Sequence, residues 1–304
     1  MSGDSDLLKT KRGYLNEDFR FFHLKDKRTQ ENTFHYHDFN KIVIFISGNA
    51  TYVIEGKYYK LRPWDILFVG RNEIHKPIID PNEVYERIII WVNSDFLIGQ
   101  STDDSNLSTC FELAIKEKTN LFRLSADKLH IIKDTLFSLE KELRDKDFGG
   151  KILQNSIFVQ LIVYLNRLIL RIQAKKDEKD IQYDERIVSI LSYINENLDS
   201  DLSIDHIASR FYMNRYYIMH NFKDQTGYTL HNYILQKRIA KAATLIKTGL
   251  QISYVSDQCG FKDYSCFVRA FKKSFGLSPK QYYKGTQELQ YSYGEAVMQD
   301  SNNE

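Results

Sequence analysis

The sequence predicts an α+β protein with an N-terminal β domain, a helical region, and a C-terminal all-α domain that contains two helix-turn-helix units. Three observations lead to this fold class. Short segments rich in Val, Ile, Tyr and Phe, separated by Gly and Pro, fill residues 15–95. From about residue 100, apolar residues recur at three- and four-residue steps. A motif near the C-terminus repeats after 49 residues.

The N-terminal segments are typical of short antiparallel strands. Gly48 and Gly56 stand in turn-like contexts, Ser-Gly-Asn and Glu-Gly-Lys, because Gly and Asn tolerate the positive φ of hairpin turns. Many short strands with turn signals at this spacing predict a small barrel or sandwich. The clearest strand candidates are Lys41–Ser47, Ala50–Ile54, Ile66–Val69 and Val84–Val92.

Two amphipathic helices are expected next, at Ser125–Arg144 and Lys151–Ile172, separated by Gly149 and Gly150. Their apolar stripes suit burial within the chain and burial across a two-fold axis equally well. The charged run Lys175–Asp180 predicts a linker, and the polar, acidic last 19 residues predict a frayed tail.

Charge and composition narrow the class of protein. The chain has 304 residues, enough for two ordinary domains, and a net charge of only +2. Residues 184–285, however, hold 14 Lys and Arg against 9 Asp and Glu, an excess of five that suits a nucleic-acid partner. The three cysteines form no CxxC pair, and neither a signal peptide nor a long apolar run is apparent. We therefore expect a cytoplasmic protein without a membrane partner.

The internal repeat has the pattern F-K-x-x-x-G-x-[T/S]-x-x-x-Y, at residues 222–233 and again at 271–282. A shorter helix and a tight turn precede each copy, with Ser203, Asn214 and Asp263 as expected N-caps. Helix, short turn and second helix make the helix-turn-helix plan.

The second helix of each unit, at 214–225 and 263–275, has one apolar and one polar face. Polar side chains near a helix N-terminus can reach base edges in the major groove, and lysines farther along can meet phosphates. An ordinary solvated face is the alternative for a single helix, and the duplication favours DNA. The helix between the units, Leu230–Lys247, would be roughly 27 Å long and would hold them about one DNA turn apart.

Residues 184–285 resemble the DNA-binding domain of the AraC/XylS family of transcription regulators. The most specific part is I-x-x-V-x-x-x-x-G-F-x-D-x-S-x-F-x-x-x-F-K-x-x-x-G-x-S-P-x-x-Y at residues 252–282. The resemblance implies seven helices, two helix-turn-helix units, and activation through contacts with RNA polymerase. Together with the helix faces, it predicts DNA contacts at Arg215, Tyr216, Met219, His220, Lys223, Tyr264, Ser265, Arg269, Lys272 and Lys273.

The N-terminal strands resemble the cupin-type effector domain of many family members. The residues that carry this resemblance are His35-x-His37, Gly48, Gly56, Leu61-x-Pro63-x-Asp65 and His75. It implies a cupin-like β-barrel that binds a small molecule. The predicted effector-binding residues are His35, His37, Arg62, Trp64 and His75, and with the tyrosines of the strands they would suit a sugar.

The three histidines admit other interpretations. They could form a three-histidine metal site, or they could be barrel residues with satisfied side chains. Metal-binding cupins place a Glu four residues after the second His, whereas this chain has Lys41, so we predict no metal and no cofactor.

The expected organisation is a cupin-like effector-binding domain at 1–105, a helical dimerisation region at 106–175, a linker at 176–183, the DNA-binding domain at 184–285 and a tail at 286–304. The predicted protein is an effector-responsive transcription activator, not an enzyme. Its expected partners are double-stranded DNA, RNA polymerase, a small molecule and a second copy of the chain. A cupin metalloenzyme with a helical interaction module and a ligand-independent regulator are the alternatives.

Overall fold

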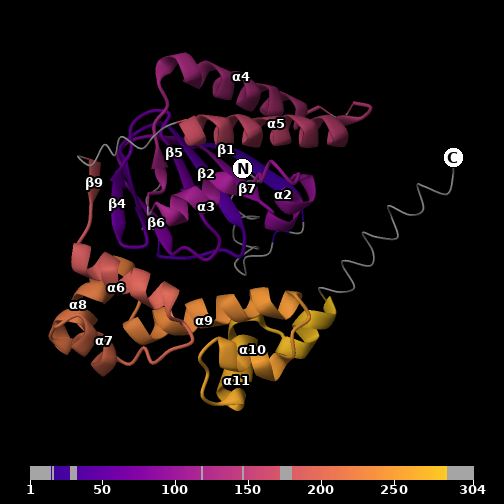
Figure 1. Cartoon of the computed structure of the whole chain (residues 1–304). Helices are drawn as coiled ribbons and strands as arrows, with labels where there is room; N and C mark the ends of the chain where they lie inside the picture. The colour runs from indigo at the N-terminus through magenta and orange to yellow at the C-terminus, as the bar shows by residue number, and fades with distance from the viewer. Residues whose placement is uncertain are drawn as a thin grey trace, which may run out of the picture. The chain divides into compact units, whose positions relative to one another are not determined.

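The computed structural model describes residues 15, 17–27, 33–117, 119–145, 147–171 and 180–285. The chain divides into two compact units, Met1–Asp184 and Glu185–Glu304 (Figure 1). The expected tail at 286–304, the first four residues of the expected linker, and Ile172 of the second expected helix lie outside the described residues.

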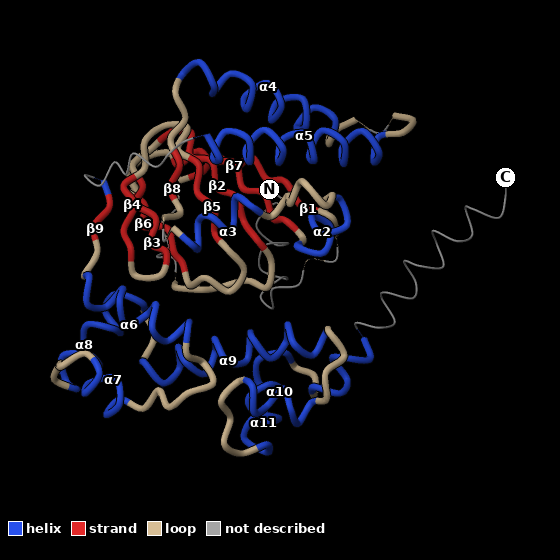
Figure 2. Tube along the Cα trace, in the orientation of Figure 1, coloured by secondary structure: helices blue, strands red, loops and turns tan. Residues whose placement is uncertain are grey.

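The first unit is built on two antiparallel sheets (Figure 2). One has the strand order β1-β7-β2-β5-β8 and the other β6-β3-β4-β9. The expected strands are confirmed to within one residue at each end. The strands are β1 (Phe19–Asp26), β2 (Asn40–Ser47), β3 (Ala50–Ile54), β4 (Lys57–Lys60), β5 (Ile66–Val69), β6 (His75–Ile79), β7 (Tyr85–Val92), β8 (Leu121–Phe122) and β9 (Ile181–Gln182).

Strand β2 is buried on both faces, which explains its nearly continuous apolar sequence. Ile42 and Ile44 belong to the core under the helices, whereas Val43 and Phe45 belong to the core between the two sheets. All four side chains are at most 1% exposed. The alternation of side chains along a strand assigns the odd-numbered residues of β2, including Lys41, to the interior between the sheets.

Helices cover the outer face of the five-stranded sheet. They are α2 (Ser94–Gln100), α3 (Thr109–Lys116), α4 (Ala126–Glu142) and α5 (Gly150–Arg171). Helices α4 and α5 lie side by side as an antiparallel pair (Figure 1). By length and composition α5 could cross a membrane, a possibility that the sequence prediction did not include. However, Phe158, Leu161 and Leu165 of this helix are buried in the core, so it serves here as a packing helix.

The two-residue strand β9 lies just before the second unit. Ile181 and Gln182 pair with Tyr59 and Tyr58 of β4, so part of the expected linker extends the smaller sheet. Asp180 is fixed as well, because Arg123 Nη1 donates to its carboxylate at 2.7 Å. The same guanidinium donates through Nε to Asp65 at 2.9 Å. The chain is thus tied to the β4–β5 connection immediately before it leaves the first unit.

The second unit is entirely helical over the described residues 185–285. Its helices are α6 (Glu185–Glu196), α7 (Ile204–Arg210), α8 (Arg215–Thr226), α9 (Leu230–Lys247), α10 (Ile252–Gln258) and α11 (Tyr264–Phe275). The three expected N-caps are confirmed, because the side chains of Ser203, Asn214 and Asp263 each accept a backbone N–H of the following turn. Both second helices end at a left-handed glycine, Gly227 and Gly276.

Candidate nucleic-acid interface and ligand site

The helix-turn-helix units consist of α7 with α8 and of α10 with α11. In each unit the second helix is anchored by two buried aromatic or aliphatic side chains on one face. These are Ile218 and Phe222 in α8 and Phe267 and Phe271 in α11, all 0% exposed. The burial of one face fixes which residues remain in contact with solvent. All the residues predicted to contact DNA are exposed, five on each helix.

The exposed face of α8 combines aromatic and thioether side chains with polar and charged ones. Arg215 donates to Asp205 of α7 at 2.6 Å, and His220 lies 3.3 Å from the Asp224 carboxylate. The Tyr216 ring is stacked on that of His220, with centroids 6.0 Å apart and an interplanar angle of 3°. Tyr216 and Met219 border a groove whose other lining residues are Ile204, Met213, Asn214 and Arg215.

The exposed face of α11 is more basic. Arg269 lies one turn from the helix start, where its Nη2 donates to the Cys266 thiol at 3.2 Å. Lys272 and Lys273 occupy the last turn, and the helix itself contains no acidic residue. Cations in the last turn interact favourably with the helix dipole and are available to phosphates.

Helix α9 joins the two helix-turn-helix units. Its 18 residues correspond to roughly 27 Å. Tyr233, Ile239 and Ala243 are buried on the faces that α8, α10 and α11 pack against. A single rigid helix therefore sets the separation of the two exposed faces, as expected for a protein that reads two successive segments of major groove.

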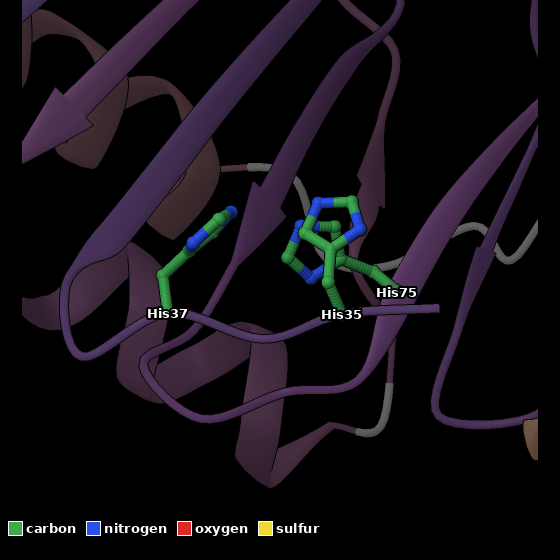
Figure 3. Close-up of side chains that lie close together, drawn as sticks. All are labelled: His35, His37 and His75. Carbon is green, nitrogen blue, oxygen red and sulfur yellow. The ribbon is translucent and has the colours of Figure 1, made fainter. Parts of the chain in front are cut away.

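The second candidate site is a cluster of histidines in the first unit. His35 and His37 come from the segment before β2, and His75 comes from the start of β6 (Figure 3). Ring centroids are 4.5 Å apart for His35 and His75, 5.0 Å for His35 and His37, and 5.2 Å for His37 and His75. One ring nitrogen of each lies within 4.8 Å of the other two. The structure thus brings together three of the five predicted effector-binding residues, from positions up to 40 residues apart.

Hydrogen bonds to backbone carbonyls orient two of the rings. His35 Nδ1 lies 2.9 Å from the Thr33 carbonyl, and His75 Nδ1 lies 2.8 Å from that of Glu73. A carbonyl accepts only, so each Nδ1 is protonated and each neutral ring keeps its lone pair on Nε2. The Nε2 lone pair of His35 is thereby left as an acceptor, and that of His75 faces the side chain of Lys41.

Lys41 is part of this cluster. Its side chain is buried, and its Nζ donates to the Tyr52 hydroxyl at 2.9 Å and lies 3.4 Å from His75 Nε2. Burial, and after it the Lys41 charge, lowers the pKa of His35 from 6.5 to about 4. The same two causes hold the pKa of His37 and that of His75 well below 6.5. At neutral pH the three imidazoles are therefore uncharged.

A divalent metal does not fit this arrangement well. A metal on the three histidines would take the Nε2 lone pair of His75, which faces the Lys41 ammonium at 3.4 Å. At the position where metal-binding cupins have a carboxylate, this chain has Lys41. The donor set of imidazole acceptors, an ammonium and a phenol suits hydroxyl groups better.

Arg62 and Trp64, the other two predicted effector-binding residues, have their contacts elsewhere. Arg62 forms an ion pair with Asp180, ahead of β9. Trp64 packs against the core under the helices, and Lys133 Nζ of α4 lies 4.0 Å from the centre of its ring. The structure does not bring these two side chains to the histidines.

Two aromatic residues beside the histidines were missed by sequence reasoning. Phe39 is stacked on His37, with centroids 4.6 Å apart, and Trp91 lies 4.9 Å from Phe39. Trp91 is opposite Lys41 in the β2–β7 register, so both belong to the same sheet face. Only the strand register, which the sequence does not reveal, could have identified it.

Comparison with known proteins finds a family domain over each of the two regions. A model described as AraC-like ligand binding domain matches residues 22–120, and one described as helix-turn-helix domain matches residues 207–285. The HTH-type transcriptional activator RhaS of Escherichia fergusonii is 23% identical over 257 residues, covering 83% of this chain and 87% of that protein.

A second curated protein and a solved structure are also similar to this chain. The HTH-type transcriptional activator RhaR of Mannheimia succiniciproducens is 23% identical over 257 residues, covering 82% of this chain and 86% of that protein. The solved structure of ToxT from Vibrio cholerae aligns with 88% of this chain and 98% of its own, at 15% identity and a TM-score of 0.34. On the two domain matches and the full-length activator relatives, this chain belongs to the AraC/XylS family and is a ligand-responsive transcription regulator with an N-terminal cupin-like domain.

Proposed function

We propose that this protein is a transcription activator that reads two adjacent major-groove segments of its operator with α8 and α11. The observation that carries the proposal is the duplicated helix-turn-helix unit, in which each second helix buries its apolar face and exposes polar or basic side chains. The similar proteins RhaS and RhaR are named transcriptional activators, which supports the direction of regulation.

The proposed DNA contacts divide by chemistry. Arg269 and Ser265 of α11 suit hydrogen bonds to base edges, whereas Lys223, Lys272 and Lys273 suit phosphates. The remaining proposed contacts are Arg215, Tyr216, Met219 and His220 of α8 and Tyr264 of α11.

The proposed effector is a small polyhydroxyl molecule such as a sugar. It would be held in the first unit by His35, His37 and His75, with Lys41 and Tyr52 as donors beside them. Sugar hydroxyls donate and accept, and therefore match Nε2 acceptors next to an ammonium and a phenol. The rings of Phe39 and Trp91 lie next to His37 and form an aromatic border beside the proposed site.

The proposed assembly is a cytoplasmic homodimer that contacts RNA polymerase when bound to DNA. Support for the dimer comes from α4 and α5, which pack on the first unit with one face and leave large apolar side chains exposed on the other. Phe137 is 51% exposed, Ile152 75% and Leu153 47%. We expect no catalytic activity, because the characterised relatives regulate transcription.

The test of the proposed function is selection of binding sites from random double-stranded oligonucleotides by the full-length chain. The expected result is an enriched sequence with two blocks about one DNA turn apart. A thermal-shift screen with neutral sugars, at concentrations well above a millimolar, tests the effector, since a bound ligand raises the melting temperature by mass action. Failure to enrich any sequence from the random pool would contradict the proposed function.

A further inference from the structure

The two recognition helices are related by a shift of 49 residues, which allows their faces to be compared position by position. His220 of α8 corresponds to Arg269 of α11, and Asp224 corresponds to Lys273. Lys223 and Lys272 are the same residue at the same place. At two exposed positions, therefore, α11 carries a permanent cation where α8 carries a histidine or an acid.

Two of the polar residues that α8 exposes, Arg215 and His220, have acidic partners close by, and Lys223 is its further cation. Arg215 donates to Asp205 at 2.6 Å, and both side chains are more than half exposed, so the pair lies on the outer face. His220 lies 3.3 Å from Asp224 one turn farther along the same helix. The face of α8 thus carries less positive charge than that of α11, and it should gain less from phosphates.

Two large side chains with apolar surface are also exposed on α8. Tyr216 is 74% exposed and Met219 is 49% exposed. The Tyr216 ring is kept in place by its parallel stacking on His220. The two side chains border the groove that Ile204 and Met213 also line. Large apolar groups on a helix that enters a major groove need an apolar partner there.

The major groove offers one such partner at base-pair edges, the 5-methyl group of thymine. We propose that α8 reads thymine methyl groups through Met219 and Tyr216, while α11 supplies most of the charge and the base hydrogen bonds. This inference rests on the proposed function, because it assumes that both helices enter the groove. It assigns to α8 a preference for T-containing base steps, and to α11 most of the dependence of affinity on salt.

The experiment uses the full-length chain and the sequence that it selects from the random pool. Arg269→Ala identifies the block read by α11, since only that block should lose its base preference, and the other block is then assigned to α8. Each thymine is replaced singly by deoxyuridine, which removes the methyl group and leaves every hydrogen-bonding group in place. Dissociation constants are measured by fluorescence anisotropy at one fixed salt concentration.

The expected result is a loss of about fourfold in affinity for each contacted methyl in the α8 block, the effect of one buried carbon. In Met219→Ala and in Tyr216→Ser, which copies Ser265 of α11, the deoxyuridine effect at one or more of these positions should disappear. Arg269→Ala should retain it. Both variants change exposed side chains, and circular dichroism melting would verify that they fold.

Two outcomes separate the inference from the proposed function. If a sequence is selected but deoxyuridine has no effect anywhere in the α8 block, the thymine-methyl inference is overturned and the regulator stands. If the α8 block contains no thymine and tolerates no substitution, the inference is overturned in the same way. If no sequence is selected, the proposed function itself falls.

Discussion

Tyr212 and Gly260 hold the same left-handed backbone conformation at equivalent places in the turns of the two helix-turn-helix units, with φ of 52° and 74°. The environments of the two residues differ. Tyr212 is 97% exposed, whereas a Cβ on Gly260 would lie 2.4 Å from the Leu198 carbonyl oxygen. That carbonyl accepts from Arg238 Nε at 2.8 Å, so the loop cannot retreat without losing a hydrogen bond.

Gly260→Ala should therefore lower the free energy of unfolding of the helical unit Glu185–Glu304 by about 2–4 kcal/mol. The cost comes from the left-handed backbone together with the steric overlap. Tyr212→Gly is the matched control and should change stability by no more than about 1 kcal/mol in the stabilising direction. Urea unfolding of the full chain, followed by far-ultraviolet circular dichroism, compares the two. Equal effects would mean that the turns are equivalent in packing as well as in backbone shape.

The histidine cluster predicts how stability depends on pH. The pKa of His35 is about 4 in the folded chain and 6.5 in the unfolded reference, so between these values the unfolded state binds more protons. The stability of the first unit should consequently fall as the pH is lowered from about 6.5 to 4. It should be independent of this group above 6.5.

His35→Gln should make this dependence less steep, because glutamine does not titrate, while His37 and His75 still contribute to it. Melting temperatures measured at half-unit steps from pH 4 to 8 would reveal the difference, with His220→Gln as the control on an exposed histidine. A profile for His35→Gln that is as steep as the original would assign the acid sensitivity to other groups.

Arg269→Ala should weaken binding to the selected operator by about 1–3 kcal/mol and relax base preference at one position. Lys272→Ala should instead weaken binding to all sequences alike and reduce the slope of log affinity against log salt by about 0.9. Anisotropy titrations at several salt concentrations distinguish the two patterns. Loss of affinity without loss of base preference in Arg269→Ala would assign that side chain to the DNA backbone.

Asp224→Lys tests the charge difference between the helices directly, since it gives α8 the residue found at the equivalent position of α11. It should tighten non-specific binding and raise the magnitude of the salt slope by up to about 0.9. Asp134→Lys, on α4 of the other unit, makes the same charge change away from the proposed interface. An equal gain for both variants would indicate a general effect of net charge.

The exposed apolar residues of α4 and α5 predict the oligomeric state. Ile152→Asp places a charge on a side chain that is 75% exposed and should leave the fold of the first unit intact. The same change should dissociate the proposed dimer, because a desolvated carboxylate in an interface lacks a partner. Light scattering of the two proteins at matched concentrations measures this. A monomeric parent protein would contradict the dimer outright.

Local patterns made the helical unit predictable. The caps at Ser203, Asn214 and Asp263 follow from side-chain chemistry within one turn, and the periodicity of α8 and α11 fixes which residues are exposed. The repeat then supplied the pairing of helices. Each of these signals spans fewer than about 20 residues, which is the range over which a sequence can be read directly.

The ligand site depended on information that is not local. Nothing in the spacing of His37 and His75 states that Lys41 Nζ lies 3.4 Å from His75, because this follows from the pairing of β2, β3, β6 and β7. The same is true of Trp64, which looked like a ligand residue by its chemistry but packs against α4 instead. Strand register decides both, and register is set by contacts between distant segments.

The pairing of β9 with β4 leaves only a short connection between the unit of the proposed ligand site and the unit of the helix-turn-helix pairs. Only Tyr183 and Asp184 separate the paired residue Gln182 from the first residue of α6. Any displacement of strand β4 on ligand binding would pass through β9 and these two residues to α6, the first helix of the second unit. Transmission of the signal would then depend on the shortness of this connection. A longer connection would uncouple ligand binding from DNA recognition while leaving both activities intact.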